Sequence, residues 1–341
     1  MFENFWGNPH VAGALERMIE QDRIPQTMLL AGAEGVGKAT LARRFGARLL
    51  GKAAKIEQDD LSLAHNISAI TDREKWPADK RNEVPLMLAT HQDFVSFAPD
   101  GPLRQLSIPQ MRVLKERGQF LPSHGRYRVF LIDHVDRANE QAANSLLKTL
   151  EEPPPHLILI MTAENAYDLL PTIRSRAVQF HLNPLTDKEM RSFAAARGLD
   201  HAEKRIALAA GSPGVATALD LEAYERRRTA MFALLEVAAG VADFGAWMRY
   251  SEAIGRGKGE KLELYLKLLY LLLRDMLLLL EGGGEIRNQD LRPQLETLAR
   301  KVSFEWIRKA VKKVDDLNDL LRRNIQKTIA LDAMILELRG A

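Results

Sequence analysis

Three glycines and a lysine have the spacing of a phosphate-binding loop, and they are the residues of this chain that most directly predict chemistry. The run Gly32-Ala-Glu-Gly35-Val-Gly37-Lys38-Ala39-Thr40 follows the pattern G-x-x-x-x-G-K-[ST] except at its last position. The glycines of such a loop let backbone N–H groups surround a phosphate, the lysine binds the outer phosphates, and the hydroxyl binds Mg²⁺. Ala39 occupies the hydroxyl position, and Thr40 lies about 100° further around the following helix. The sequence therefore predicts a nucleotide site that lacks one ligand.

A candidate Mg²⁺ ligand follows an apolar run further along the chain. Val129-Phe-Leu-Ile132 ends in Asp133, where hydrolytic P-loop enzymes hold metal with an aspartate and usually orient water with a following glutamate. His134 stands in the glutamate position. A neutral imidazole lacks the charge and the bidentate reach of a carboxylate, so we interpret His134 as a substituted relic and keep Asp133 as a site residue.

Two arginines lie between a predicted helical turn and a strand, in Leu170-Pro-Thr172-Ile-Arg174-Ser175-Arg176-Ala177. Exposed arginines in a loop commonly make surface ion pairs worth about 1 kcal/mol or less. An arginine in such a loop can also act as an arginine finger on a phosphate held by another subunit, with an effect of about 10³ to 10⁵ on rate. The spacing alone leaves both interpretations open.

Alternating strand and helix patterns predict the fold around these residues. Five apolar, β-rich runs are separated by helical patterns, which favours an α/β domain with a parallel sheet covered by helices on both faces. The P-loop then lies between the first strand and a helix over 38–50, where such folds bind ligands. A helix over 139–152 should end at Pro153-Pro-Pro155. The predicted strands are Met28 to Ala31, Asp93 to Phe97, Val129 to Asp133, Leu157 to Thr162 and Val178 to Leu182.

Helical patterns dominate the sequence after Leu182. Thr186 and Glu189 form a predicted capping box, in which each side chain accepts a backbone N–H of the other residue, and it opens a small helical region. The segment from Gly51 to Thr90 is polar and irregular, so we predict a surface insertion there without chemistry. The predicted domains are an α/β nucleotide domain at 1–183, a helical lid at 184–222 and an all-helical domain at 223–341.

Composition excludes several other classes of protein. A chain of 341 residues with 46% hydrophobic and 27% charged residues fits a globular protein of two or three domains. The apolar stretch Leu262 to Leu280 contains four charged residues, so we expect a buried helix and no membrane span. The absence of cysteine excludes disulfides and cysteine zinc sites, and no metal site is predicted from the eight histidines. The N-terminus lacks signal-peptide features, which predicts a cytoplasmic location.

Two further motifs, with the P-loop and the strand before Asp133, resemble the clamp-loader branch of the AAA+ ATPases. They are Asn144-Ser-Leu-Leu-Lys148-Thr-Leu-Glu151-Glu152-Pro-Pro154, which is highly specific for that branch, and Thr172-Ile-Arg-Ser175-Arg176. The resemblance extends from Phe5 to the end of the chain, and Asn324 to Arg339 resembles the last helix of the family's collar. It implies an α/β P-loop AAA+ domain, a small helical lid and an all-α C-terminal collar domain that joins subunits.

The sequence departs from the ATP-hydrolysing gamma/tau subunits of that family at three positions. Those subunits keep the P-loop hydroxyl, the glutamate after the strand and a lid arginine, where this chain has Ala39, His134 and Gly214. The resemblance therefore implies a non-hydrolysing subunit that requires no cofactor, with weak ATP or ADP binding left open. The family commonly has a four-cysteine zinc module in the region corresponding to 51–90, and we expect no zinc here because the cysteines are absent.

The resemblance also implies partners and a role for Arg176. It implies a hetero-pentameric ring with gamma/tau and delta subunits of DNA polymerase III, in which Arg176 reaches the ATP site of a neighbour and the ring loads a sliding clamp on primer–template DNA. Two alternatives stay open. One is an active ATPase that uses Thr40 and His134. The other is a DNA-binding module that uses basic groups at Glu225-Arg-Arg-Arg228, Lys312-Lys313 and Arg322-Arg323.

Overall fold

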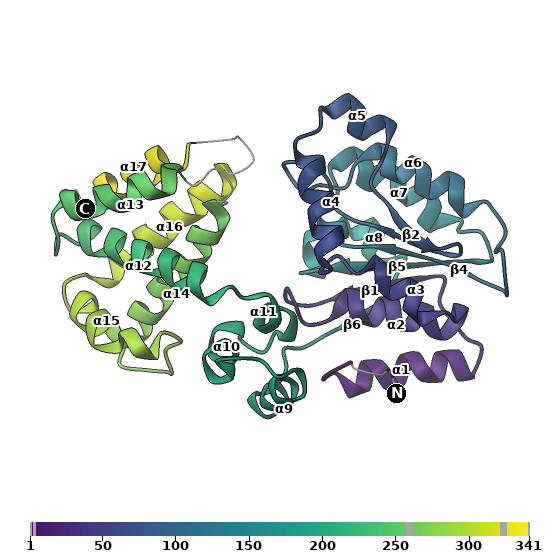
Figure 1. Ribbon diagram of the computed structural model, residues 1–341, viewed down its shortest axis with the longest axis horizontal. Coiled ribbons are helices and arrows are strands. Elements are labelled where there is room, and N and C mark those ends of the chain that lie inside the picture. Colours follow the sequence, from purple (N-terminus) through teal and green to yellow (C-terminus); the bar gives the residue numbers. More distant parts are fainter. Residues whose placement is uncertain (1, 3–4, 257–261, 321–325, 340–341) are drawn as a thin grey trace. The chain divides into compact units, whose positions relative to one another are not determined.

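The computed structural model describes residues 2, 5–256, 262–320 and 326–339 (Figure 1). The chain divides into two compact units, Met1–Ala218 and Leu219–Ala341, and each is described by itself. The first unit contains the sheet and the helices of the predicted lid, and the second unit is helical in its described part. The division into three domains stays a prediction.

The first unit contains a six-stranded sheet in the order β2-β3-β4-β5-β1-β6. All neighbouring strands are parallel except β2 and β3, which are antiparallel. Every residue of β1, β3, β4 and β5 is buried, as expected for strands covered on both faces. The predicted mostly parallel α/β sheet is confirmed. The strands are β1 Thr27–Ala31, β2 Leu88–His91, β3 Phe94–Phe97, β4 Arg128–Ile132, β5 Leu157–Ala163 and β6 Val178–His181.

Two hydrophobic cores form because alternate residues of each strand point to opposite faces of the sheet. In β4, Val129 packs into the core that contains Phe45 of α2, whereas Phe130 packs into the core that contains Leu146 of α7. Figure 1 shows α1 and α2 on one side of the sheet and α6 and α7 on the other. The helices around the sheet are α1 Pro9–Glu20, α2 Lys38–Leu50, α6 Ile108–Gly118, α7 Glu140–Glu151 and α8 Pro171–Arg174, with short 3₁₀ turns η2 Val135–Arg137 and η3 Ala166–Asp168.

The segment 51–90, predicted to be a surface insertion, is mostly exposed, but it folds into short helices and a strand instead of an irregular loop. Ile56 is fully buried in the hydrophobic core that contains Phe45, and Ile70 and Leu86 form a small core with Ala98. Arg73 of α4 makes a 2.6 Å ion pair with Asp100, and both side chains are 8% exposed. Each of these short elements buries at most one apolar side chain, which leaves too weak a periodic pattern to detect. The segment forms α3 Ala53–Ile56, η1 Glu57–Asp59, α4 Ala64–Glu74, α5 Ala78–Glu83 and strand β2.

Three helices follow β6 and complete the first unit. The predicted capping box is confirmed, since Glu189 accepts hydrogen bonds from the backbone N–H and the hydroxyl of Thr186 at 2.8 Å. The ring of Trp6 packs edge-to-face on Phe193 at 5.8 Å, which joins the N-terminal segment to these helices. The helices are α9 Asp187–Arg197, α10 Ala202–Ala209 and α11 Pro213–Ala218.

The described part of the second unit consists of helices. The apolar helix α14 is largely buried, as expected, and none of the helices in the described ranges has the length and apolar character of a membrane span. Arg322-Arg323 and Asn324 lie outside the described residues. The helices are α12 Leu221–Ala238, α13 Phe244–Arg256, α14 Leu262–Leu280, η4 Gln289–Leu291, α15 Arg292–Ala299, α16 Phe304–Leu320 and α17 Lys327–Arg339.

Candidate functional site

The P-loop connects β1 to α2 at the carboxyl edge of the sheet, as the sequence predicted. Its glycines are needed because other parts of the chain approach them closely. A Cβ added to Gly32 would lie 2.3 Å from the carbonyl oxygen of Leu182, and one added to Gly37 would lie 3.1 Å from the ring of Phe5. Both glycines also have positive φ, 153° and 102°. Tight packing is therefore a reason for glycine at these positions in addition to phosphate binding.

The lid helix α11 contacts the P-loop directly. The backbone N–H of Gly214 donates a 2.8 Å hydrogen bond to the carbonyl oxygen of Gly35. A Cβ on Gly214 would lie 3.0 Å from the Cα and the oxygen of Gly35, and a Cβ on Gly35 would lie 2.8 Å from the nitrogen of Val215. Gly214 stands at the position where the ATP-hydrolysing gamma/tau subunits have the lid arginine. In this structure a side chain at that position would be crowded by the backbone of the P-loop.

Lys38 points back into its own loop. Its Nζ donates hydrogen bonds to the carbonyl oxygens of Gly32 at 2.6 Å and Ala33 at 2.9 Å, and the residue is buried. Burial lowers the pKa of Lys38, and the negative charges of nearby carboxylates, Glu164 first and then Asp133, oppose that shift. The ammonium group that would bind phosphate is therefore held by the loop itself.

The hydroxyl position and its neighbour lie on the first turn of α2. Ala39 packs against the hydrophobic core that contains Leu41 and Phe45, so this position has an apolar environment. Thr40, the next residue, is partly buried on the same helix. The methyl group of Ala39 therefore lies at the position where the motif has its Mg²⁺-binding hydroxyl. Thr40 is the next residue of the P-loop segment.

Asp133 lies at the carboxyl end of β4, where the sequence placed it, and its carboxylate has a partner that the sequence analysis missed. Thr162, at the end of β5, donates its hydroxyl to Asp133 Oδ1 at 2.5 Å and accepts the backbone N–H of His134 at 2.9 Å. The signal that could have found Thr162 is a hydroxyl near the end of the apolar run that forms the neighbouring strand. His134 itself has left-handed backbone geometry, with φ 52°.

Arg176 follows α8, and its guanidinium has only surface partners among the described contacts. It donates to Glu151 Oε1 at 2.9 Å and to the carbonyl oxygen of Thr172 at 3.0 Å. The side chains of Arg176 and Glu151 are 34% and 50% exposed, so this ion pair should contribute at most about 1 kcal/mol. Arg174 instead packs over the ring of Tyr167 at 4.9 Å. Of the two arginines, Arg176 is the one whose guanidinium group can exchange its partners for others with little loss of stability.

Two of the three basic groups proposed for DNA binding contain residues that are already paired. Arg228 is buried and donates to Glu225, Asn288 and Asp290. Lys313 makes an ion pair with Glu337, which raises the pKa of the lysine. These contacts favour a structural role for Arg228 and Lys313.

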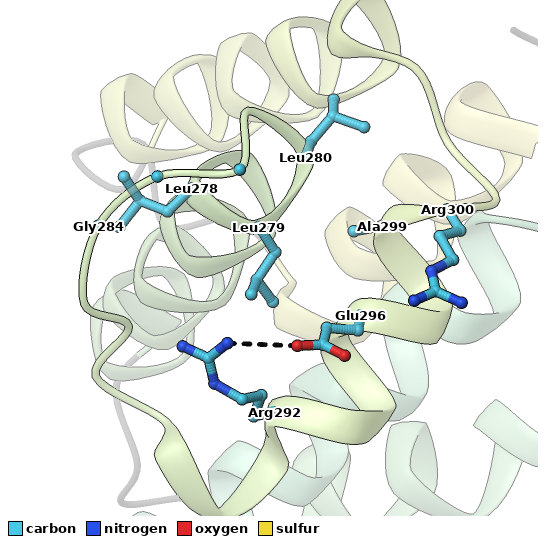
Figure 2. A pocket seen from close by; sticks show the side chains of 10 residues that line it. Leu278, Leu279, Leu280, Gly284, Arg292, Glu296, Ala299 and Arg300 are labelled. Carbon is cyan, nitrogen blue, oxygen red and sulfur yellow. Dashed lines mark hydrogen bonds and ion pairs between the residues drawn. The ribbon is translucent and has the colours of Figure 1, made fainter.

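A pocket in the second unit, drawn in Figure 2, lies between the end of α14 and α15 and has a volume of about 390 Å³. Leu278, Leu279 and Leu280 line it from α14. Across the pocket, Arg292 makes a 3.3 Å ion pair with Glu296, and the two side chains point toward each other in Figure 2. Arg300 also lines the pocket.

The close approach at Gly32 gives a testable prediction. Replacing Gly32 with alanine should lower the free energy of unfolding of the first unit by about 2–3 kcal/mol, because the new methyl group collides with the Leu182 carbonyl and the backbone is strained. Gly51→Ala is the matched control, since Gly51 also has positive φ but has nothing within 4 Å of an added Cβ. Urea unfolding of both variants measures the difference. Equal losses would mean that backbone strain alone explains the glycine.

Several known proteins resemble this chain in sequence. Residues 7–186 match the protein family described as "DNA polymerase III, delta subunit". The chain is 31% identical over 190 residues to DNA polymerase III subunit tau of Salmonella typhimurium, covering 56% of this chain and 26% of that protein. It is 30% identical over 192 residues to DNA polymerase III subunit gamma of Buchnera aphidicola subsp. Schizaphis graminum, covering 56% of this chain and 47% of that protein.

A solved structure also resembles the chain at low identity. It is a gamma subunit-related protein of DNA polymerase III from Thermotoga maritima, with 17% identity, a TM-score of 0.42, and coverage of 96% of this chain and 98% of that one. The chain spans about a quarter to a half of the length of the tau and gamma relatives named above. Since the family match covers more than half of the 341 residues, the chain belongs to the DNA polymerase III delta-subunit family of clamp-loader proteins.

Proposed function

We propose that this chain is the non-hydrolysing, delta-prime-type subunit of a bacterial DNA polymerase III clamp loader. Its own P-loop serves as a scaffold, and Arg176 acts in trans as an arginine finger on ATP bound to a neighbouring subunit. The partners in this proposal are gamma/tau and delta subunits in a hetero-pentameric ring, with the sliding clamp and primer–template DNA reached through the ring. The related proteins carry the names tau, gamma and delta, so the delta-prime assignment depends on the residues of the site itself.

The observation that carries the proposal is the contact between the lid and the P-loop. Gly214 replaces the lid arginine and donates its N–H to Gly35, whose backbone would lie 3.0 Å from a Cβ on Gly214. The other two substitutions, Ala39 and His134, remove the metal-binding hydroxyl and the carboxylate that orients water. Losing about 10² in rate for each group would make turnover at this site negligible.

The surroundings of Arg176 support its role as the donated group. Only an arginine offers a planar fork of N–H donors that binds phosphate oxygens in a bidentate manner. Glu151 and the Thr172 carbonyl hold this fork at the surface through exposed hydrogen bonds. A phosphate with two or more negative charges would compete effectively with one exposed carboxylate.

The first test of the proposal is ATP turnover by the purified chain alone. We expect no turnover above background with Mg²⁺ and DNA, while binding of ATP or ADP, if present, should be weak and insensitive to Mg²⁺. A Lys38→Ala variant serves as the control for contaminating ATPases. Turnover that disappears in Lys38→Ala would favour the alternative of an active ATPase that uses Thr40 and His134.

A further inference from the structure

Three side chains that could bind a metal ion come together beside the P-loop. His134 and Asp136 lie in the turn after β4, and Glu164 directly follows β5. One ligand atom from each residue lies within 4.8 Å of the other two. Sequence spacing does not reveal this group, because 28 positions separate Asp136 from Glu164 and the parallel pairing of β4 with β5 brings them together.

Two of these ligand atoms are buried and unpaired. His134 Nδ1 and Asp136 Oδ1 have almost no contact with solvent and no hydrogen-bond partner among the described residues, and they lie 4.0 Å apart. The side chain of Asp136 is only 12% exposed. Buried polar atoms are nearly always satisfied by protein, water or an ion. A ligand between these two atoms would satisfy both.

Backbone contacts hold the group in place. The N–H of His134 donates to the Thr162 hydroxyl at 2.9 Å, and the N–H of Glu164 donates to Asp136 Oδ2 at 3.2 Å. These bonds connect the turn after β4 to the loop after β5 and leave Asp136 Oδ1 pointing toward the imidazole. Asp133 lies outside the group, and its Oδ1 accepts the Thr162 hydroxyl.

The side chains of Lys38 and Arg137 lie near the group. Lys38 has hydrogen-bond partners elsewhere, and Arg137 is paired with one member of the group. Lys38 donates to the carbonyl oxygens of Gly32 and Ala33, and its charge also acts on Glu164 and Asp136 without a hydrogen bond to either. Arg137 lies 3.7 Å from Glu164 Oε1, and both side chains are more than a third exposed. An exposed ion pair of this kind is weak. Two carboxylates and a neutral imidazole together carry two negative charges, which a divalent cation would balance.

We propose that His134, Asp136 and Glu164 bind a divalent first-row transition metal ion, with Mn²⁺ as the representative ion. Imidazole nitrogen with two carboxylate oxygens is a donor set of intermediate softness that suits such metals. Mg²⁺ prefers oxygen ligands in near-ideal octahedral geometry and is a poor match for this set. The bound ion would join the turn after β4 to the loop that leads through η3 and α8 to Arg176. The site goes beyond the proposed function and does not depend on it.

The test is Mn²⁺ binding to the full chain, measured by electron paramagnetic resonance of free Mn²⁺ and by calorimetry. We expect one equivalent to bind, and Asp136→Asn and Glu164→Gln to weaken affinity by at least about tenfold. Asp168→Asn is the matched control, since this exposed carboxylate belongs to η3 and not to the group. Circular dichroism of each variant checks that it is folded.

Each outcome decides the proposal. Stoichiometric binding that is lost in both group variants and kept in Asp168→Asn supports it. No binding by the wild-type chain, or binding that both group variants retain, overturns it. Excess Mg²⁺ that displaces Mn²⁺ completely would contradict the predicted metal class. The measurement uses neither ATP nor other subunits, so its result is independent of the arginine-finger experiment.

Discussion

Replacing Arg176 with alanine should lower ATP hydrolysis at the adjacent site of a reconstituted clamp loader by about 10³-fold or more. The reason is that the guanidinium fork would stabilise negative charge that develops on the transferred phosphoryl group, while Arg174, the other arginine of Thr172-Ile-Arg-Ser175-Arg176, packs over the ring of Tyr167 instead. The variant should fold normally, because the side chain gives up only an exposed ion pair with Glu151 and one hydrogen bond to Thr172. The expected loss of stability is about 1 kcal/mol or less.

The measurement is single-turnover hydrolysis by the complete ring, with clamp and primed DNA present, so that one affected site is not hidden by the others. Arg174→Ala is the matched control, since it removes an arginine two residues away that packs on Tyr167. Arg176→Lys keeps the charge without the planar fork and should recover only a small part of the rate. Unchanged hydrolysis in Arg176→Ala, with normal assembly of the ring, would show that the finger assignment is wrong.

The sequence predicted the main sheet well because the signals were local and strong. Each of the five predicted runs matches a strand to within one residue at each end, and Asn139 caps α7 by accepting the N–H of Ala142, as an N-terminal asparagine should. Strand β2 was missed because only four residues form it, two of them exposed, at an antiparallel edge of the sheet. The helices of 51–90 were missed because their stabilising contacts, such as the Arg73–Asp100 ion pair, connect residues far apart in sequence.

The candidate site shows the same difference between local and long-range information. The residues of the P-loop and Asp133 could be named from their spacing, and the structure places them at one edge of the sheet. The contact of Gly214 with Gly35 and the hydroxyl of Thr162 on Asp133 could not be named, because each depends on packing between distant segments. The contact of Gly214 with Gly35 and the close approach of Leu182 to Gly32 give a structural reason for glycine at these positions, in addition to phosphate binding.

The second large effect is expected in the helical unit, where Asp275→Ala should lower the free energy of unfolding by about 3–5 kcal/mol. Asp275 is fully buried on α14, inside the apolar stretch that resembles a membrane span in length. Its carboxylate accepts the backbone N–H groups of Arg287 at 3.1 Å and Asn288 at 2.8 Å, and the side-chain amide of Asn288 at 2.8 Å. Alanine would leave these donors without an acceptor and would also create a cavity.

Urea unfolding, followed by helical circular dichroism, measures this loss. Asp275→Asn should lower the free energy of unfolding by less than Asp275→Ala, because it keeps the volume and one acceptor oxygen. Its NH₂ group, however, would face other donors. Arg274→Ala is the matched control, since Arg274 also contacts Asp275, at 3.1 Å, but its side chain is 45% exposed. That variant should lose about 1 kcal/mol or less. If Asp275→Ala were as mild as Arg274→Ala, the carboxylate would not be what fixes the 286–288 segment against α14, and apolar packing of the helix would have to be sufficient.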